Sequence, residues 1–267
     1  MRAIQRLEAF LLAWLFTLLM LPAAFAGGVH QTAAPPSLKR TVFTGTFNRI
    51  NVSGYLTVVI RGVQSAKNPS VVFSTSPAEA IQARVNHHTL YLNTLSSPTN
   101  LTRRPSVTVW MNSLKGLVVN GSANVVGTNV QSSGLRISSL GTGTIKFLGV
   151  ISLNEIQQIG NSQIALRWVN SHTIYIHSCG TGSIHLAGVA KTVYARMLES
   201  SVLQATYLRT QYAQVQAKDN AVAYVCPVET LRAFASDNAT IYYYKNPVNL
   251  TRHTSESGNV LQMAWHN

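Results

Sequence analysis

The sequence predicts an all-β protein, a parallel β-solenoid with about 19–20 residues in each turn of the coil. Three observations lead to this fold class. A motif of three mostly small residues returns eight times after residue 117, and its copies begin 18 to 20 residues apart. Apolar residues recur at fixed distances from the motif. Between the motifs, apolar and polar residues alternate, which is typical of strands with one buried face.

Each copy of the motif marks a corner of the coil. The third residue is always Ala, Gly or Ser, which lets successive corners stack closely. Gly, Asn, Asp and Ser fill many of the other positions, and these residues accept the left-handed and turn conformations that a corner needs. The first residues of the eight copies are Gly121, Gly141, Gly160, Gly180, Glu199, Asp219, Asp237 and Glu256.

Two apolar columns flank the corners and supply the core. Four residues after the first position stand Val125, Ile145, Ile164, Ile184, Leu203, Ala223, Ile241 and Val260. Four residues before it stand Leu117, Ile137, Ile156, Ile176, Ala195, Val215, Ala233 and, as the one exception, Arg252. A strand–turn–strand unit cannot bury its apolar face alone, but stacked copies can. We therefore expect a coil that is right-handed, as other parallel crossovers are. A twisted antiparallel β-sandwich is the alternative, although it does not require such regular columns.

The same register predicts two free thiols. Cys179 and Cys226 lie in copies that are two steps apart. Stacked strands are about 4.8 Å apart, so the two residues are separated by nearly 10 Å along the coil axis. A disulfide needs Cα atoms within about 7 Å of each other.

We expect residues 1–26 to be a secretory signal peptide. Arg2 and Arg6 precede an apolar run over residues 9–21, and Ala24-Phe25-Ala26 has the small-x-small pattern of a cleavage site. A membrane-spanning helix needs about 20 apolar residues, so the run is short for one, although an uncleaved anchor is the alternative. No later stretch approaches spanning length, and we expect the mature chain in the periplasm or at the cell surface.

The remaining chain divides into three parts. We expect a flexible arm over residues 27–42, a single solenoid domain over residues 43–262 and a tail over residues 263–267. Within the domain, residues 43–116 have a looser pattern with longer loops, and we expect this half to cap one end, because an open edge would pair with other chains. Its expected strands are residues 56–60, 70–73, 90–92 and 106–110.

Two segments carry a resemblance to a known family. Residues 47–54 followed by Val58-Val59-Ile60, and residues 117–123 with the later Gly-Thr-Gly copies, resemble the family called "putative autotransporter adhesin, head GIN domain" over roughly residues 43–262. The resemblance implies an exported, all-β, solenoid-like protein and supplies no catalytic residues. The chain departs from the family pattern in its acidic first positions. It also departs at Ser53-Gly54-Tyr55, where Tyr stands in place of a tiny residue.

The charge balance favours anionic partners. The formal net charge is +13, and +12 without the leader residues Arg2, Arg6 and Glu8. Such a chain suits acidic glycans, lipopolysaccharide or phospholipid head groups. The basic residues are scattered, with no cluster denser than Lys39-Arg40 or Arg103-Arg104, so we do not expect nucleic acid as a partner.

Four of the motif's first positions form a candidate acidic row: Glu199, Asp219, Asp237 and Glu256. Carboxylates stacked about 5 Å apart repel one another, and a bound Ca²⁺ would relieve this repulsion. The interpretation that we prefer is that these carboxylates accept corner N–H groups, so we predict no resident metal.

A second candidate site is aromatic. Tyr224 and Tyr242 share one outward column, Tyr244 lies two residues further along, and His185 lies further back. Such a strip can hold sugar rings or the apolar surface of a partner. The alternative is that the rings only stabilise the sheet.

No pattern of catalysis or of cofactor binding is present. The chain has no G-x-S-x-G and no H-E-x-x-H motif. Outside the acidic row the mature chain keeps only Glu79, Glu155 and Glu229, whereas a glycosidase needs two carboxylates flanking one bond.

We therefore predict an exported, non-catalytic binding or adhesion module that presents a rigid surface to envelope glycans or to a protein partner. The alternatives are a structural envelope component that self-associates end to end, and a carbohydrate-active enzyme.

Overall fold

The computed structural model describes residues 39–42, 46–63, 69–73, 81–94 and 104–264, which all belong to one compact unit, Pro36–Asn267. These residues form strands, turns and bends, and none of them lies in a helix that could cross a membrane. The all-β fold class is therefore confirmed. The signal peptide predicted over residues 1–26, most of the arm and the last residues of the tail lie outside the described residues.

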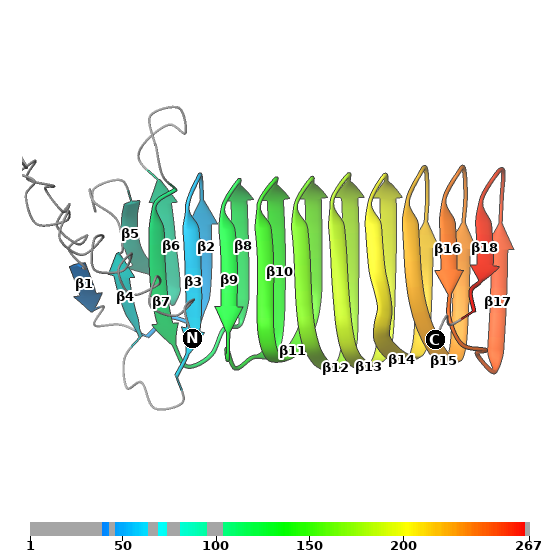
Figure 1. Cartoon of the computed structure of the whole chain (residues 1–267), viewed down its shortest axis with the longest axis horizontal. Helices are drawn as coiled ribbons and strands as arrows, with labels where there is room; N and C mark the ends of the chain where they lie inside the picture. The colour runs from blue at the N-terminus through cyan, green and yellow to red at the C-terminus, as the bar shows by residue number, and fades with distance from the viewer. Residues whose placement is uncertain (1–38, 43–45, 64–68, 74–80, 95–103, 265–267) are drawn as a thin grey trace, which may run out of the picture. The chain divides into compact units, whose positions relative to one another are not determined.

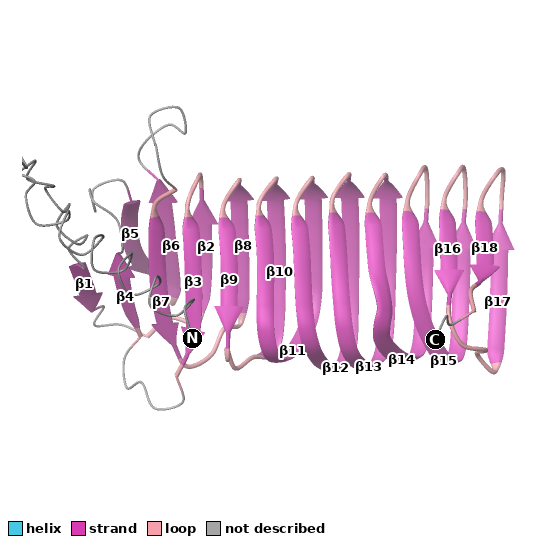
Figure 2. Cartoon of the chain, in the orientation of Figure 1, coloured by secondary structure: helices cyan, strands magenta, loops and turns pink. Residues whose placement is uncertain are grey.

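The strands form one sheet that coils on itself (Figures 1 and 2). Their bounds are β1 Lys39–Val42, β2 Arg49–Ser53, β3 Thr57–Gly62, β4 Ser70–Phe73, β5 Ile81–Asn86, β6 Thr89–Thr94, β7 Ser106–Met111, β8 Gly116–Gly121, β9 Asn124–Thr128, β10 Ser133–Gly141, β11 Thr144–Gly160, β12 Gln163–Gly180, β13 Ser183–Glu199, β14 Val202–Ala217, β15 Val222–Ala235, β16 Thr240–Tyr243, β17 Asn249–Thr254 and β18 Asn259–Gln262.

Each turn of the coil is a rung with two faces. We call the strand segments that follow a corner the first face; they include β3, β9, the opening halves of β11 to β15, β16 and β18. The segments that lead to the next corner form the second face. The corners lie at the top of Figure 1, and the bends that join the two faces lie at the bottom.

The predicted columns are ladders of direct strand partners. Ile145 pairs with Ile164, Ile164 with Ile184, and Ile184 with Leu203, and all four side chains are fully buried. On the second face, the column from Leu117 continues in register to Arg252, which is exposed on the last rung. The parallel β-solenoid is thus confirmed, because equivalent residues lie over one another in a dry core.

All eight corners place the first motif residue at positive φ, as the choice of residues predicts. The corners have two geometries. Gly corners have φ between 85° and 135°, whereas acidic corners have φ between 56° and 62°. An acidic corner is also closed by a backbone hydrogen bond, such as that from the N–H of Ala221 to the carbonyl of Lys218 at 3.2 Å.

The first end of the stack departs from chain order. The rung made by β2 and β3 lies between the β6–β7 rung and the β8–β9 rung, with parallel pairing on both sides. Among the described strands, the antiparallel pairs are β1–β4, β4–β7 and β5–β6, and they lie at this end (Figure 1). The four strands expected before residue 117 correspond to β3, β4, β6 and β7.

One register assignment was wrong by a residue. The corner of the β2–β3 rung is at Gly54, which has φ 100° and donates its N–H to the Asn120 carbonyl. The residue in the tiny column is therefore the fully buried Leu56, whose carbonyl accepts the N–H of Asn124, and not Tyr55.

The prediction of two free thiols is confirmed. Cys179 is half-buried at a corner and Cys226 is buried near a bend, and the two are unbridged. The two cysteines lie on different rungs, as the repeat register requires.

Candidate binding face

One outward column of the first face joins several polar and aromatic residues. Its members are successive strand partners across β11 to β16: Lys146, Ala165, His185, Gln204, Tyr224 and Tyr242. The predicted alignment of His185 with the tyrosines is therefore confirmed. Because outward side chains of a regular parallel sheet repeat at the strand spacing, this column is a straight strip across the rungs.

A groove of about 780 Å³ follows this strip over β11 to β14. Its lining includes the short side chains of Ala165 and Ala187, which leave space between the longer Lys146, Arg167 and Tyr207. Tyr207 is 74% exposed. The groove thus offers two cations and an aromatic ring around a floor of small residues.

The groove leads to a pair of stacked rings. Tyr224 and Tyr242 have ring centroids 4.9 Å apart and planes inclined by 16°. Burial raises the pKa of Tyr224, and the neighbouring Tyr242 and Tyr244 raise it further. All three tyrosines are half-buried, so each ring packs on the sheet and still presents one side to solvent.

The second face carries a ring pair that the sequence reasoning missed. Tyr175 and Tyr194 are strand partners with centroids 5.3 Å apart and planes inclined by 12°. They stand five residues before their corners, and alignment of that column would have revealed them. The aromatic stacking is therefore a feature of both faces.

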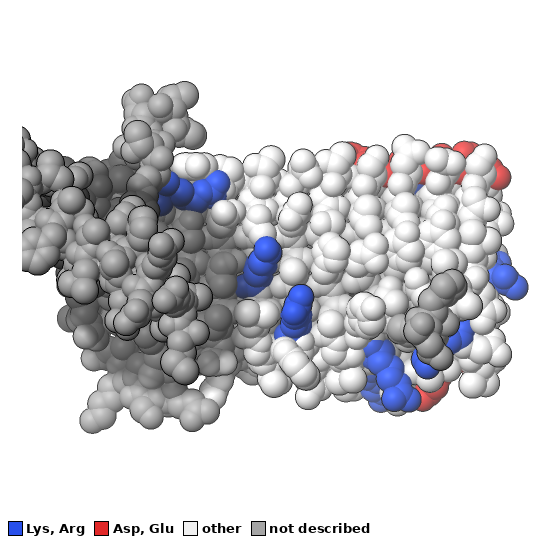
Figure 3. All heavy atoms as spheres, viewed as in Figure 1, with Lys and Arg blue, Asp and Glu red and all other residues white. Residues whose placement is uncertain are grey.

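Charge is unevenly placed on the first face, which Figure 3 shows toward the viewer. Lys and Arg side chains are dispersed over this face, whereas Asp and Glu side chains gather along the corner edge, with one further acidic group at the bend edge. In the described part of the chain, Arg136 and Glu155 form a salt bridge, with a 3.7 Å separation. This salt bridge lies on the second face, because Arg136 and Glu155 each stand five residues before a corner.

The acidic row forms a ladder of side-chain-to-backbone hydrogen bonds. The Asp219 carboxylate accepts the N–H of Glu199 at 3.1 Å, and the Asp237 carboxylate accepts the N–H of Asp219 at 3.3 Å. The pKa of Asp237 is held below its usual value, mainly because its carboxylate accepts the N–H of Asp219. The hydrogen bond from the Ser236 hydroxyl lowers this pKa by a smaller amount. For Asp219 and Asp237 this geometry is the one that we preferred, in which the carboxylate accepts the N–H of the adjacent corner.

Within the described residues, no group of three or more His, Cys, Asp and Glu side chains is arranged to hold a metal ion. The hypothesis of a cation on Glu199, Asp219, Asp237 and Glu256 stays a prediction.

The two thiols are poorly placed for nucleophilic chemistry. A hydrogen bond from Cys179 to the Glu199 carboxylate, at 3.2 Å, raises the pKa of Cys179. Burial raises the pKa of Cys226, although Lys245 and Arg209 partly offset this effect. A thiol with a raised pKa carries little thiolate near neutral pH, and the thiolate is the reactive form.

Sequence comparison now places the chain. Residues 46–247 match the family described as "Putative auto-transporter adhesin, head GIN domain". The chain belongs to the head GIN domain family. The resemblance drawn from the corner motifs is thereby confirmed. No curated protein matches the sequence.

Solved structures share the fold of this head GIN domain at low sequence identity. A "putative adhesin" from Parabacteroides distasonis has a TM-score of 0.75 and 16% identity, over 85% of this chain and 96% of the other. A "putative adhesin" from Parabacteroides merdae has a TM-score of 0.71 and 14% identity, over 85% and 95%. A "putative lipid binding protein" from Parabacteroides distasonis has a TM-score of 0.69 and 15% identity, over 86% and 98%. At these identities the likeness is one of fold.

Proposed function

We propose that this head GIN domain is an exported, non-catalytic binding module that holds an acidic envelope glycan across its first face. The observation that carries the proposal is the continuity of the groove with the Tyr224–Tyr242 stack along one column. Aromatic rings pack against the apolar sides of sugar rings, and Lys146 and Arg167 lie where they can pair with carboxylate or phosphate groups of the chain. The signal-peptide pattern of residues 1–26 and the adhesin family support export.

A glycan array tests this proposal with a matched pair of double variants. Tyr224→Ser with Tyr242→Ser removes the stack on the first face, and Tyr175→Ser with Tyr194→Ser removes the equivalent stack on the second face. We expect the first variant to weaken binding to acidic glycans about tenfold or more, because stacking area and ring order are both lost. We expect the second variant to bind as the parent does.

Two results would contradict the proposal. Equal losses in the two variants would show that the tyrosines act through sheet stability, and absence of parent binding to every acidic glycan would reject the function itself. Binding that does not weaken with rising salt would also contradict it, because exposed charge pairs are screened.

A second candidate function is self-association, which the far end of the stack favours. In the described residues β17 pairs with β15 and β18 pairs with β16, and each has no strand on its outer side. Strand edges of this kind add further strands. A structural role in the envelope would use this end, and not the first face.

A further inference from the structure

The bend between the two faces carries a register shift on several rungs, and on the β14–β15 rung this shift coincides with a proline. On β14 the register advances from Thr210 to Tyr212, while on β15 it advances from Pro227 to Thr230, so β15 has one residue more. Pro227 has no N–H to donate to the ladder. The extra residue forms a bulge at Val228 and Glu229, and bulges redirect side chains where they occur.

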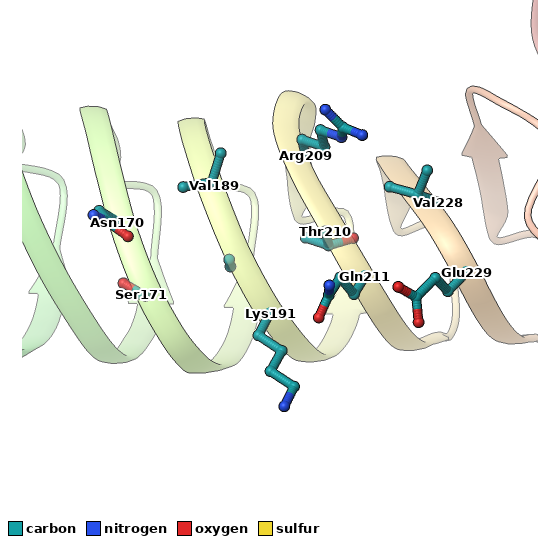
Figure 4. A pocket seen from close by; sticks show the side chains of 10 residues that line it. Asn170, Ser171, Val189, Lys191, Arg209, Thr210, Gln211, Val228 and Glu229 are labelled. Carbon is teal, nitrogen blue, oxygen red and sulfur yellow. The ribbon is translucent and has the colours of Figure 1, made fainter.

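A groove of about 440 Å³ crosses the bend at this bulge, over β12 to β15 (Figure 4). Its volume lies within the roughly 300–1,000 Å³ of small-molecule sites. It is separate from the groove on the first face, and the two sets of lining residues have no member in common.

The groove is lined by a buried hydroxyl that has no partner. Thr210 is 3% exposed, and its Oγ1 makes no hydrogen bond in the described structure. Ser171, in the same inward column, has a partner, because its Oγ accepts the N–H of Leu153 at 2.8 Å. A buried hydroxyl without a protein partner is destabilising unless water or a ligand group bonds to it, and the place of Thr210 in the groove wall lets a bound ligand supply that group.

The charged side chains around the groove are of both signs. Lys191, Arg209 and Glu229 line it together with the Gln211 amide. In Figure 4, Glu229 points from β15 toward β14, and Arg209 and Lys191 extend to opposite sides of the groove. Glu229 also accepts a hydrogen bond from the Tyr212 hydroxyl, which orients the carboxylate and raises the pKa of Tyr212. Two cations and one carboxylate leave one net positive charge.

We propose that this groove binds a single sugar acid, a ring that carries one carboxylate and several hydroxyl groups. The ligand carboxylate pairs with Arg209 or Lys191, and the ring hydroxyls bond to Glu229, Gln211 and Thr210. A neutral sugar leaves both cations unpaired, and inorganic phosphate is repelled by Glu229 and offers fewer hydroxyl donors than a sugar ring does. The ligand class therefore follows from the mixture of charges.

Titration calorimetry with glucuronate, glucose and inorganic phosphate tests the proposal on the intact mature chain. We expect glucuronate to bind about tenfold more tightly than either of the others, as one charge-assisted pair allows. Arg209→Gln should weaken glucuronate binding about tenfold, and Arg232→Gln, an exposed arginine outside the groove, should leave it unchanged. Equal affinity for the three ligands, or no glucuronate binding, would overturn the proposal.

Thr210→Val separates a ligand-binding hydroxyl from a structural one. Valine keeps the shape and the β-branching, so the variant should fold and melt at or above the parent temperature. We expect glucuronate affinity to fall several-fold. A stabilised variant with unchanged affinity would mean that water satisfies the hydroxyl, and it would remove Thr210 from the site.

This inference rests on the proposed function only in taking a glycan component as the ligand. The Tyr224→Ser, Tyr242→Ser variant distinguishes the two failures, because it should keep its affinity for glucuronate. Array binding that depends on the tyrosines without any glucuronate binding would reject the bend site alone. Glucuronate binding without any array binding would reject the first-face function alone.

Discussion

Gly180 lies at a corner where both backbone angle and space exclude a side chain. Its φ is 115°, and a Cβ atom there would overlap the carbonyl group of Gly160 on the preceding rung. The adjacent acidic corner at Glu199 accepts a side chain because its φ is only 60°. Individual residues therefore decide which of the two corner geometries a rung adopts.

We expect Gly180→Ala to destabilise the fold by about 2–4 kcal/mol, since strain and a steric clash add together. Gly134→Ala is the matched control. Gly134 also has positive φ, at 88°, but the nearest atom to a new Cβ is Asn154 Cβ at 3.9 Å. The control should lose only about 1 kcal/mol, the cost of the left-handed conformation. Urea unfolding measures both, and equal losses would contradict the role of the stacked carbonyl.

Residue patterns predicted the corners well and the groove at the bend poorly. The first motif position predicted positive φ because only a few residue types accept it. The unpaired hydroxyl of Thr210 could not be predicted in this way, because it depends on how β14 and β15 pair. The available signal was Pro227, since proline inside a strand repeat indicates a break in the ladder.

The acidic row is a property of neighbouring rungs, and its effect on stability depends on pH. The pKa of Asp237 is lowered in the folded state from its usual value of 3.8. A lowered folded-state pKa means that the carboxylate contributes stability above pH 3.8, and that this contribution is lost as pH falls through the folded pKa.

Asp237→Asn should therefore melt below the parent at neutral pH, and the two melting temperatures should converge as pH falls below 3.8. Glu155→Gln, which removes a carboxylate outside the row and its salt bridge to Arg136, gives the size of an ordinary surface ion-pair effect for comparison. A melting difference that stays constant between pH 7 and pH 3 would mean that the shape of the side chain, and not its charge, matters at this corner.

The cation hypothesis gives a separate prediction for the same row. If Ca²⁺ binds between the carboxylates, added calcium raises the melting temperature of the parent, because a ligand of the folded state stabilises it. The Asp219→Ala, Asp237→Ala variant should lack this rise. Differential scanning fluorimetry with calcium and with magnesium measures the effect, and an unchanged parent would reject the hypothesis.

The two ends of the described stack are unlike each other. Among the described strands, the first end finishes in the antiparallel strands β1 and β5, each paired on one side, whereas the far end finishes in the parallel strands β17 and β18. If the parallel end associates with its own copy, two chains meet end to end through the same surface, and we expect growth to stop at a pair because the first end presents antiparallel strands instead of that surface. Self-association would thus produce a dimer and not a fibre.

Light scattering over a range of concentrations tests this expectation. Leu261→Lys places a charge on the open edge strand and should shift the chain toward monomer. Val248→Lys, at an 81% exposed position outside the strands, is the control. A parent that stays monomeric at the highest concentrations would reject the structural alternative, and larger assemblies would show that the first end associates as well.

At this scale the sequence predicted the repeat but not the order of the rungs. The columns from Leu117 onward have constant spacing, so chain order and spatial order agree there. Before Leu117, Ile50 pairs with both Leu90 and Leu117, and no local pattern shows that one residue serves two distant partners. The periodicity of a sequence shows which residues face the core, but it does not show which distant strands pair with each other.

The intercalated β2–β3 rung has a consequence for how the protein is made. Although this segment emerges early in synthesis, its flanking partners, β6 to β9, come later, so it cannot acquire its final neighbours while it is the newest part of the chain. Folding must therefore involve the later strands β6 to β9 before the β2–β3 segment can take its place between them. In a chain that crosses a membrane from its amino end, this segment would therefore lack its final neighbours until Thr128, the end of β9, has passed through.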